Sequence, residues 1–181
     1  MDARIEKTKR KIKDALFSIL EKKAIADVTI SEICLKARVN RNTFYSHFDT
    51  PEKVLEEIMD EYLAEEYKVL NAYSATKEIV IAACEFTKKH AKENIVLLSN
   101  LSEKLFIEMG VNYSVASSIY IIDNKEGKLS PKQIEMIHTY IVNGAVSIIK
   151  EWLYSGMKES PEEIGETVDY ITTSLIKGIN P

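Results

Sequence analysis

The stretch that decides the fold is VTISEICLKARVNRNTFYSHF, residues 28–48. Thr29 and Glu32 have the spacing of a capping box, which predicts a short helix that ends near Ala37. Asn40 is a favourable N-cap residue, so a second short helix is expected directly after a tight turn. Two short capped helices joined by such a turn make a helix-turn-helix unit.

The apolar residues of this stretch indicate which side of each helix faces inward. They are Ile30, Ile33, Cys34 and Ala37 in the first helix, and Val39, Phe44 and Phe48 in and around the second. With these residues buried, the side chains of Arg41, Asn42 and Tyr45 project outward. Arginine can bond to O6 and N7 of guanine, and asparagine to N6 and N7 of adenine, each with about 1–3 kcal/mol of base discrimination.

Further polar residues of the same unit suit the phosphate backbone. Thr43, Tyr45 and His47 carry hydroxyl or ring N–H donors, and Thr29 offers a hydroxyl or the helix N-terminus behind it. We interpret the whole group as a surface that reads DNA. A polar helix face that merely meets water is the alternative interpretation of the same residues.

The charges divide along the chain in the same way. The net charge is −4, but residues 1–50 hold 11 Lys and Arg against 7 Asp and Glu, so this segment is +4 and the remainder is −8. The asymmetry favours an N-terminal piece that meets a polyanion. The basic residues of the expected first helix are interpreted mainly as a solvated face; they are Lys7, Lys9, Arg10 and Lys13.

Helix is expected nearly throughout, so the predicted fold class is all-α. Three Ser-Pro or Thr-Pro pairs begin at Thr50, Ser130 and Ser160. Each predicts a helix start, because the hydroxyl caps the helix and proline lacks the N–H that would have no partner there. The expected helices are 3–22, 29–37, one from residue 40, 50–70, 75–92, 94–101, 103–122, 131–154 and 161–178.

Several other classes of protein find no support in the sequence. It has no GxSxG, P-loop, HExxH or glycine-rich dinucleotide turn, so no enzyme, cofactor or metal site is expected. Cys34 and Cys84 have no CxxC partner and are expected to be small buried hydrophobes. No apolar run approaches the roughly 20 residues that span a bilayer, and no apolar stretch follows the N-terminal charges. A cytoplasmic protein without a membrane segment is expected.

The helix-turn-helix residues resemble the signature of the tetracycline-repressor (TetR) family of bacterial transcriptional regulators. The matching residues are Thr29, Ile33, Ala37, Val39, Arg41, Thr43, Phe44, Tyr45, His47 and Phe48. EKTKRKIKDAL (6–16) resembles the family's first helix, and YIVNGAVSIIKEWLYSGMKESPEEI (140–164) resembles its last two helices. The resemblance implies a helix-turn-helix DNA-binding domain at 1–50 and a helical effector-binding and dimerisation domain at 51–181.

Two positions depart from the family pattern. Arg38 stands where the family usually has a glycine in the turn. Either Arg38 adopts a positive φ, at a cost on the order of 1 kcal/mol, or the turn differs and Arg38 is an extra phosphate contact. Pro51 stands where the family commonly has a lysine that reaches a phosphate, and Lys53 is expected to take that role.

The resemblance also implies a homodimer in which the last two helices of each copy form a four-helix bundle. A single short recognition helix contacts few bases, so two half-sites and a two-fold dimer are expected. The expected interface residues are Ile134, Ile141, Val142, Ala145, Ile149, Trp152, Val168, Ile171 and Leu175. An internal core is the alternative interpretation of these apolar faces.

The middle of the chain is rich in tyrosine, phenylalanine and methionine, a composition that suits a small-molecule pocket. The resemblance implies that such a pocket would hold an inducer. The candidate residues are Tyr62, Phe86, Phe106, Met109, Tyr113 and Tyr120. A role in the core is the alternative for each of them.

The expected function is therefore that of a ligand-responsive repressor, which binds a palindromic double-stranded DNA operator as a homodimer. One alternative is a DNA-binding protein of the same fold without an inducer, in an architectural or occlusion role. The other is a helical enzyme or protein-interaction module in which the basic N-terminal helices are incidental.

Overall fold

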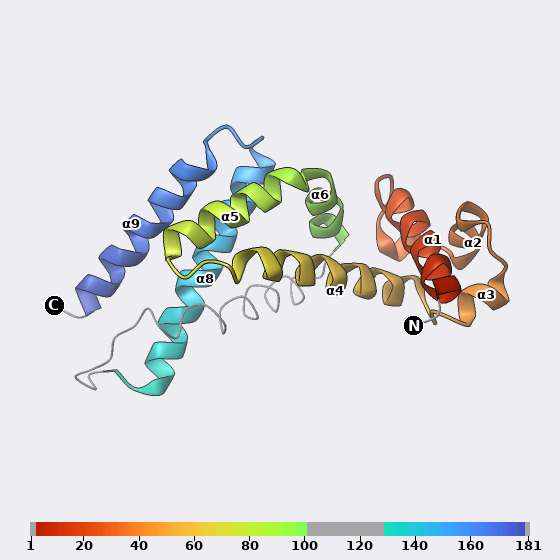
Figure 1. The fold of residues 1–181 in the computed structure, drawn as a ribbon, viewed down its shortest axis with the longest axis horizontal. Helices are drawn as coiled ribbons and strands as arrows, with labels where there is room; N and C mark the ends of the chain where they lie inside the picture. The colour runs from red at the N-terminus through yellow and green to blue at the C-terminus, as the bar shows by residue number, and fades with distance from the viewer. Residues whose placement is uncertain (1–2, 101–128, 180–181) are drawn as a thin grey trace. The chain divides into compact units, whose positions relative to one another are not determined.

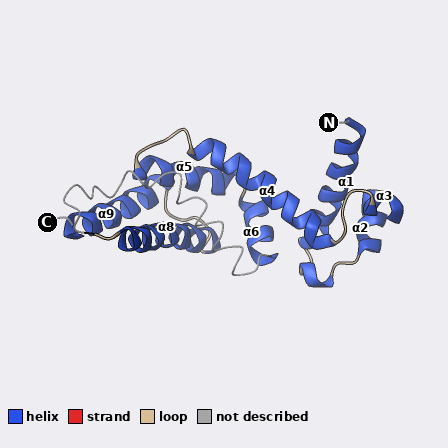
Figure 2. Ribbon diagram, turned by 90° about the horizontal axis from the view of Figure 1, so that it is seen from below, coloured by secondary structure: helices blue, strands red, loops and turns tan. Residues whose placement is uncertain are grey.

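The computed structural model describes residues 3–100 and 129–179, and within these two ranges every regular element is a helix (Figure 2). The described part of the chain therefore confirms the all-α prediction. The predicted helix at 103–122 lies outside the described residues, as do Phe106, Met109, Tyr113 and Tyr120. None of the described helices is long and apolar enough to cross a membrane.

The N-terminal helices begin and end close to the predicted positions. They are α1 (Ala3–Leu20), α2 (Ile30–Ala37), α3 (Arg41–Tyr45) and α4 (Pro51–Leu70). Helix α1 ends two residues before the expected Lys22, and a short 3₁₀ helix, η1 (Ile25–Asp27), was not expected. The later helices are α5 (Thr76–Lys89), α6 (Ala91–Asn100), α8 (Pro131–Tyr154) and α9 (Pro161–Ile179), shown in Figure 1.

The predicted helix starts are formed by the predicted side chains. Thr50 accepts a hydrogen bond from the backbone N–H of Lys53 at 3.3 Å. Ser130 and Gln133 make a reciprocal capping box at the start of α8. Ser160 and Glu163 do the same before α9, with bonds of 2.8 and 3.2 Å. These bonds use backbone N–H groups that the first turn of a helix leaves without a partner.

The chain packs as two units. Among the described residues, one unit contains 3–64 and 95–100, and the other contains 65–94 and 129–179. Helix α4 thus contributes residues to both units. The division into domains at residues 50 and 51 stays a prediction, because packing units do not establish which segment folds or acts alone.

The first unit has a small core in which the helix-turn-helix is fixed on α1 and α4. Ile12 and Leu16 of α1, Ile33 of α2, Phe44 of α3 and Val54 of α4 are each 0% exposed. Burial of the Ile33 and Phe44 side chains confirms the predicted inner faces of α2 and α3. It also determines which side chains remain on the outside.

The second unit is built around α5, which lies along α9 and also contacts α8 (Figure 1). Its core contains Val80, Cys84, Trp152, Ile164 and Val168. Cys84 is 0% exposed, and burial raises the pKa of its thiol to about 12. Cys34 is also buried. Both cysteines are therefore small buried hydrophobes, as predicted.

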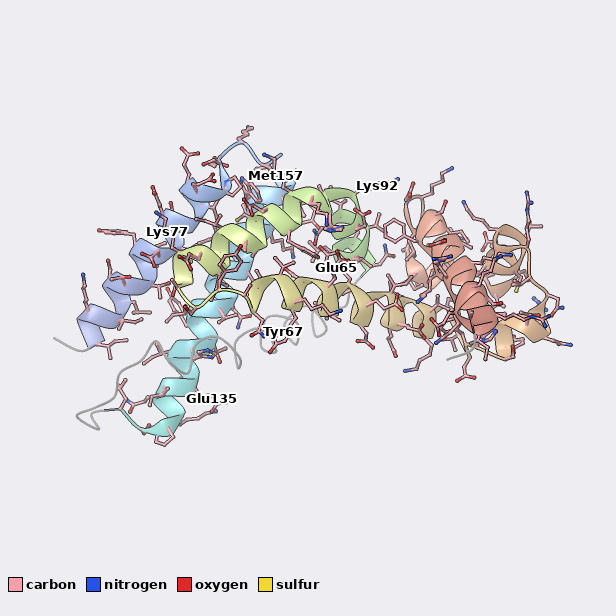
Figure 3. All side chains as sticks on the ribbon, viewed as in Figure 1. Glu65, Tyr67, Lys77, Lys92, Glu135 and Met157 are labelled. Carbon is pink, nitrogen blue, oxygen red and sulfur yellow. The ribbon has the colours of Figure 1, made fainter. Side chains whose placement is uncertain are left out.

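The contact between α5 and α9 is close at one glycine. A Cβ atom at Gly165 would lie 2.5 Å from Cγ1 of Ile81 and 3.2 Å from the backbone oxygen of Lys77. An ion pair of 2.8 Å between Lys77 and Glu166 lies beside this contact, and Figure 3 shows Lys77 in the first turn of α5. The absence of a side chain at Gly165 lets the two helices approach each other.

Candidate DNA-binding surface

The start of α2 is held by the predicted capping box. The Thr29 hydroxyl accepts from the backbone N–H of Glu32 at 3.3 Å and donates to the Glu32 carboxylate at 2.7 Å. That carboxylate also accepts from the Thr29 backbone N–H at 2.9 Å. Because the Thr29 hydroxyl proton is committed to Glu32, the backbone N–H groups of the helix N-terminus are the donors that remain here for a phosphate.

The Glu32 carboxylate carries a firmly held negative charge at this surface. Lys23 donates to it at 2.7 and 2.9 Å. The bond from Lys23, together with those from Thr29, lowers the pKa of Glu32 to about 2. The Lys23 ammonium group therefore partly neutralises an acidic residue of the helix-turn-helix.

The turn between α2 and α3 contains Arg38 in the left-handed conformation, with φ 55° and ψ 47°. Its backbone N–H donates to the carbonyl oxygens of Cys34 and Leu35, which closes the end of α2. This geometry confirms the first of the two alternatives for this position, a positive φ at a non-glycine residue. The Arg38 side chain is exposed, so it also stays accessible to a phosphate.

Helix α3 starts at the predicted cap. The Asn40 side-chain oxygen accepts from the backbone N–H of Thr43 at 2.7 Å. Phe44 faces inward, with its ring centroid 6.1 Å from that of Phe48 and 5.8 Å from that of Tyr45. The inward phenylalanines therefore determine which side of this short helix meets the solvent.

The outward side of α3 carries the residues that were predicted to read bases. Arg41 and Asn42 are exposed, and the Tyr45 side chain is 54% exposed. Thr43 and His47 are half-buried at the edge of the same unit. The structure thus brings these residues together on α3 and the turn that follows it.

One contact of this surface was not expected from the sequence. Nη2 of Arg41 donates to Oγ of Ser31 at 2.5 Å, which joins the outer sides of α3 and α2. The sequence gives no signal for this contact, because serine near a helix start usually indicates only local capping. The relative position of α2 and α3 places its hydroxyl beside Arg41, and spacing along the chain does not reveal this.

Lys53 lies in the first turn of α4 and forms a 2.5 Å ion pair with Glu56. Both side chains are about half exposed, and a hydrogen bond to Glu56 raises the pKa of Lys53. Its ammonium group is therefore charged and partly neutralised by Glu56. A phosphate contact from Lys53 stays a prediction.

The interpretation of the basic residues of α1 as a solvated face is wrong for Lys13, which is only 8% exposed. Lys13 donates to Glu57 at 3.2 Å and to Glu61 at 2.5 Å, both on α4. Lys9 pairs with Glu57 at 2.5 Å, and its Nζ lies 5.3 Å from the ring centroid of Phe48. These lysines fix α1 against α4, because their partners are displayed one turn apart on that helix.

The residues predicted for a dimer interface divide into two groups. Trp152 and Val168 lie in the core of the protomer, 2% and 3% exposed, so they offer no surface to a second copy. Ala145 and Ile149 pack against the same core. Ile171 is 45% exposed, and the half-buried residues are Ile134, Ile141, Val142 and Leu175.

Of the large apolar side chains that are exposed on α8 and α9, sequence reasoning identified Ile171 and missed the others. The exposed large apolar residues are Met136, Tyr140 and Tyr154 on α8, and Tyr170 and Ile171 on α9. Tyr140 is 67% exposed and Tyr170 is 74% exposed. The helical period could have indicated them, since Tyr140 and Tyr154 lie on the side of α8 opposite Ile149.

Only part of the predicted ligand pocket lies in the described residues. Tyr62 is half-buried on α4 in the first unit, and Phe86 is buried on α5 in the second. The ring centroids of Phe86 and His90 lie 4.5 Å apart, so Phe86 packs within its own unit. The pocket as a whole stays a prediction.

The geometry of α2 and α3, with polar side chains directed outward from a buried base, defines a helix-turn-helix DNA-binding protein. The family comparisons agree with this class. Residues 12–58 match the model of bacterial regulatory proteins of the tetR family, and residues 74–174 match the model of a transcriptional regulator C-terminal region. The chain belongs to the TetR family of DNA-binding transcriptional regulators, and this membership indicates a regulator rather than an enzyme.

Individual proteins are similar to this chain in sequence or in structure. The chain is 32% identical over 104 residues to the uncharacterized HTH-type transcriptional regulator YxbF of Bacillus subtilis (strain 168), a match that covers 56% of this chain and 26% of that protein. A TetR transcriptional regulator from Streptococcus agalactiae 2603V superimposes with a TM-score of 0.76 at 18% identity, over 94% of this chain and 96% of that one.

A second solved structure is named the dihydroxyacetone kinase operon activator DhaS. It superimposes with a TM-score of 0.59 at 18% identity, over 94% of this chain and 96% of its own. At this level of identity, the two structural matches show a common fold.

Proposed function

We propose that this chain binds a palindromic operator as a homodimer and represses transcription until a small molecule releases it. The observation that carries the proposal is the outward group on α3, where Arg41 and Asn42 are exposed and Tyr45 is 54% exposed above a buried phenylalanine. Arginine and asparagine are the residues best suited to guanine and adenine edges in the major groove. Thr43 and His47 supply flanking phosphate contacts in this arrangement.

A dimer contacts more base pairs than a single α3 can. Helix α3 has 5 residues and contacts few base pairs, so two copies on half-sites about 34 Å apart give the needed specificity. The exposed tyrosines of α8 and α9 support the proposal of a second copy. Aromatic residues of this exposure are more typical of protein interfaces than of surfaces that meet only water.

The release step is a population shift. A ligand in the C-terminal unit favours a spacing of the two α3 helices that does not match the operator, and the ligand's differential affinity sets the size of the effect. Helix α4 is the proposed carrier, because it follows α3 and contributes residues to both units. Lys9 and Lys13 tie α1 to the same helix through Glu57, so α1 moves with α4.

The base-reading step is tested by mobility shift with the DNA upstream of the chain's own gene and with a scrambled duplex. Arg41→Ala, combined with Tyr45→Phe, is expected to weaken specific binding by about 1–3 kcal/mol and nonspecific binding far less. Lys158→Ala, in the exposed turn between α8 and α9, controls for the loss of one positive charge. Equal losses on both duplexes would show that Arg41 does not read bases.

The direction of regulation and the inducer are tested separately. Transcription from the bound promoter should fall when the protein is added, whereas a rise would make it an activator, as the name of the relative DhaS describes. A compound that raises the melting temperature should also lower operator affinity. If every such compound left operator affinity unchanged, the alternative without an inducer would replace the release step.

A further inference from the structure

The bond between Arg41 and Ser31 distinguishes Arg41 from the other outward residues of α3. Nη2 of the guanidinium donates to the Ser31 hydroxyl oxygen at 2.5 Å, and both residues are exposed. Arginine is long and samples many rotamers, so an exposed one has no fixed direction by itself. The Ser31 hydroxyl gives this guanidinium a direction.

The backbone is held in place by helix caps at both residues of this bond. Ser31 follows the capping residue of α2 by two positions, and the Thr29–Glu32 box determines how α2 begins. Arg41 is the first residue of α3, whose start is fixed by Asn40. The helices are anchored from below by Ile33 and Phe44, both 0% exposed. The hydroxyl of Ser31 therefore occupies a defined place from which to hold the side chain of Arg41.

The bond to Ser31 leaves other N–H donors of Arg41 available for a base. A guanidinium has several N–H donors in a planar fork, and Ser31 accepts from only one of them. The remaining donors can still bond to O6 and N7 of a guanine. An arginine that is already oriented loses less conformational freedom on binding than a free one.

We propose that Ser31 is a positioning residue for DNA reading, which orients the Arg41 guanidinium toward a guanine of the operator half-site. The inference rests on the proposed function, in that it assumes that Arg41 reads a base. Ser31 acts through Arg41 and contributes to specificity rather than to general attraction for DNA. Removal of its hydroxyl should weaken specific binding roughly 2- to 13-fold, which is the range for immobilising one flexible side chain.

A merely structural role for Ser31 would have different consequences. The residue is exposed near the start of α2, where alanine is at least as favourable for helix as serine. Ser31→Ala should therefore leave the melting temperature unchanged or slightly raised. Ser31→Thr retains the hydroxyl and should keep most of the specific affinity.

The first experiment is a double-mutant cycle. The probe is the duplex that the wild-type chain selects from a random-sequence library, compared with a scrambled duplex of the same length and composition. Ser31→Ala should lower affinity for the selected duplex and leave the scrambled one nearly unchanged. In an Arg41→Ala background the same substitution should not lower affinity further, because the guanidinium through which Ser31 acts is absent.

The second experiment needs no DNA. Nitrogen-edited NMR of the free protein should show that the Arg41 guanidinium is ordered and slow to exchange in the wild type and in Ser31→Thr. The same signals should broaden or average in Ser31→Ala. Identical guanidinium signals in the wild type and Ser31→Ala would overturn the positioning role.

The outcomes separate the two proposals. A loss from Ser31→Ala that persists in the Arg41→Ala background overturns the inference, because Ser31 would then act on DNA by itself. Unchanged affinity for the selected duplex in Ser31→Ala overturns it as well. A wild-type chain that binds both duplexes equally overturns the proposed base reading instead, and the NMR comparison then decides alone whether Ser31 holds Arg41.

Discussion

Two exposed surfaces of this molecule differ in the chemistry of their side chains. The outward side of α3 presents Arg41 and Asn42, which are donors for a polyanion. The outward sides of α8 and α9 present Tyr140 and Tyr170, whose aromatic rings are stabilised when a partner buries them away from water. Exposure by itself therefore does not indicate a partner, whereas the chemistry of the exposed groups does.

The two packing units also hold together differently. The first fixes its helix-turn-helix on fully buried side chains such as Ile33 and Phe44, and ion pairs such as Lys13 with Glu61 join α1 to α4. The second relies on the close approach of α5 and α9 at Gly165 and on the core around Trp152. Substitutions should therefore affect the two units by different physical routes, and the following predictions begin with the largest expected effect.

Tyr170→Asp should break the apolar surface of α9. Tyrosines at the centre of an interface commonly contribute 2 kcal/mol or more, so the dissociation constant of the proposed dimer should rise about 30-fold or more. In a two-fold dimer the change occurs in both copies, and a carboxylate replaces each ring. Sedimentation equilibrium measures the dissociation constant directly.

Tyr67→Asp is the matched control for Tyr170→Asp. Tyr67 is 45% exposed on α4, where Figure 3 labels it, and it lies on neither α8 nor α9. The control should leave the dimer intact. A dimer that survives Tyr170→Asp equally well would place the interface elsewhere on the chain.

Gly165→Ala should destabilise the second unit through a clash with Ile81 and the Lys77 carbonyl. Overpacking of this kind costs about 1–3 kcal/mol and opposes the gain of about 1 kcal/mol that alanine usually gives in a helix. Gly178→Ala on the same helix is the control, because a Cβ there has nothing within 4 Å. Urea unfolding at fixed protein concentration should therefore show shifts of opposite sign in the two variants, and equal shifts would refute the steric account.

Arg38→Gly should stabilise the first unit by about 1 kcal/mol, because glycine adopts the φ of 55° without strain. The same change removes a cation of the candidate DNA-binding surface, so DNA of any sequence should bind more weakly and with a smaller salt dependence. Arg38→Ala loses the charge but keeps most of the strain. If Arg38→Ala stabilised the fold as much as Arg38→Gly, the backbone explanation would fail.

The ion pairs between α1 and α4 should make stability depend on pH at both ends of the range. Burial opposes the charge on Glu57, yet hydrogen bonds from Lys9 and Lys13 outweigh it and lower the pKa of Glu57 below 4.5. Its contribution is present above pH 4.5 and is lost as the pH falls through the lowered pKa. Burial likewise opposes the charge on Lys13, but bonds to Glu61 and Glu57 raise its pKa above 10.5.

The contribution of Lys13 is therefore present below pH 10.5 and is lost as the pH rises through the raised pKa. Lys13→Met should remove this alkaline loss and reduce the acid one, since Glu57 then keeps only Lys9. The midpoints of urea unfolding, measured from acid to alkaline pH, test both the acid and the alkaline loss of stability. We expect this to be the smallest of the four effects, and an unchanged alkaline loss in Lys13→Met would contradict it.

The local part of this protein was predictable from the sequence. The caps at Thr29, Asn40 and Thr50 formed as predicted because their bonds join residues only three apart. The helical period also identified Phe44 as inward and Arg41 as outward. These features depend on spacing within one helix, so the neighbouring residues in the chain are enough to predict them.

The misjudged residues are those whose environment comes from distant segments. Lys13 belongs to a basic stretch, yet its ammonium group forms ion pairs with Glu57 and Glu61 of α4. Trp152 belongs to an apolar stripe that suits an interface, yet the core around Val80 and Cys84 encloses it. A stripe of apolar residues shows that a face is covered, and it does not show whether the cover is the same chain or another.

The sequence by itself therefore determined the helices, their caps and the outward position of Arg41 and Asn42, because these depend on spacing along one helix. Only the tertiary structure decided that Ser31 meets Arg41, that Lys13 is buried and that Trp152 lies in the core of its own unit. The physical reason is that these contacts depend on how separate helices are placed against each other, and helical periodicity does not carry that information.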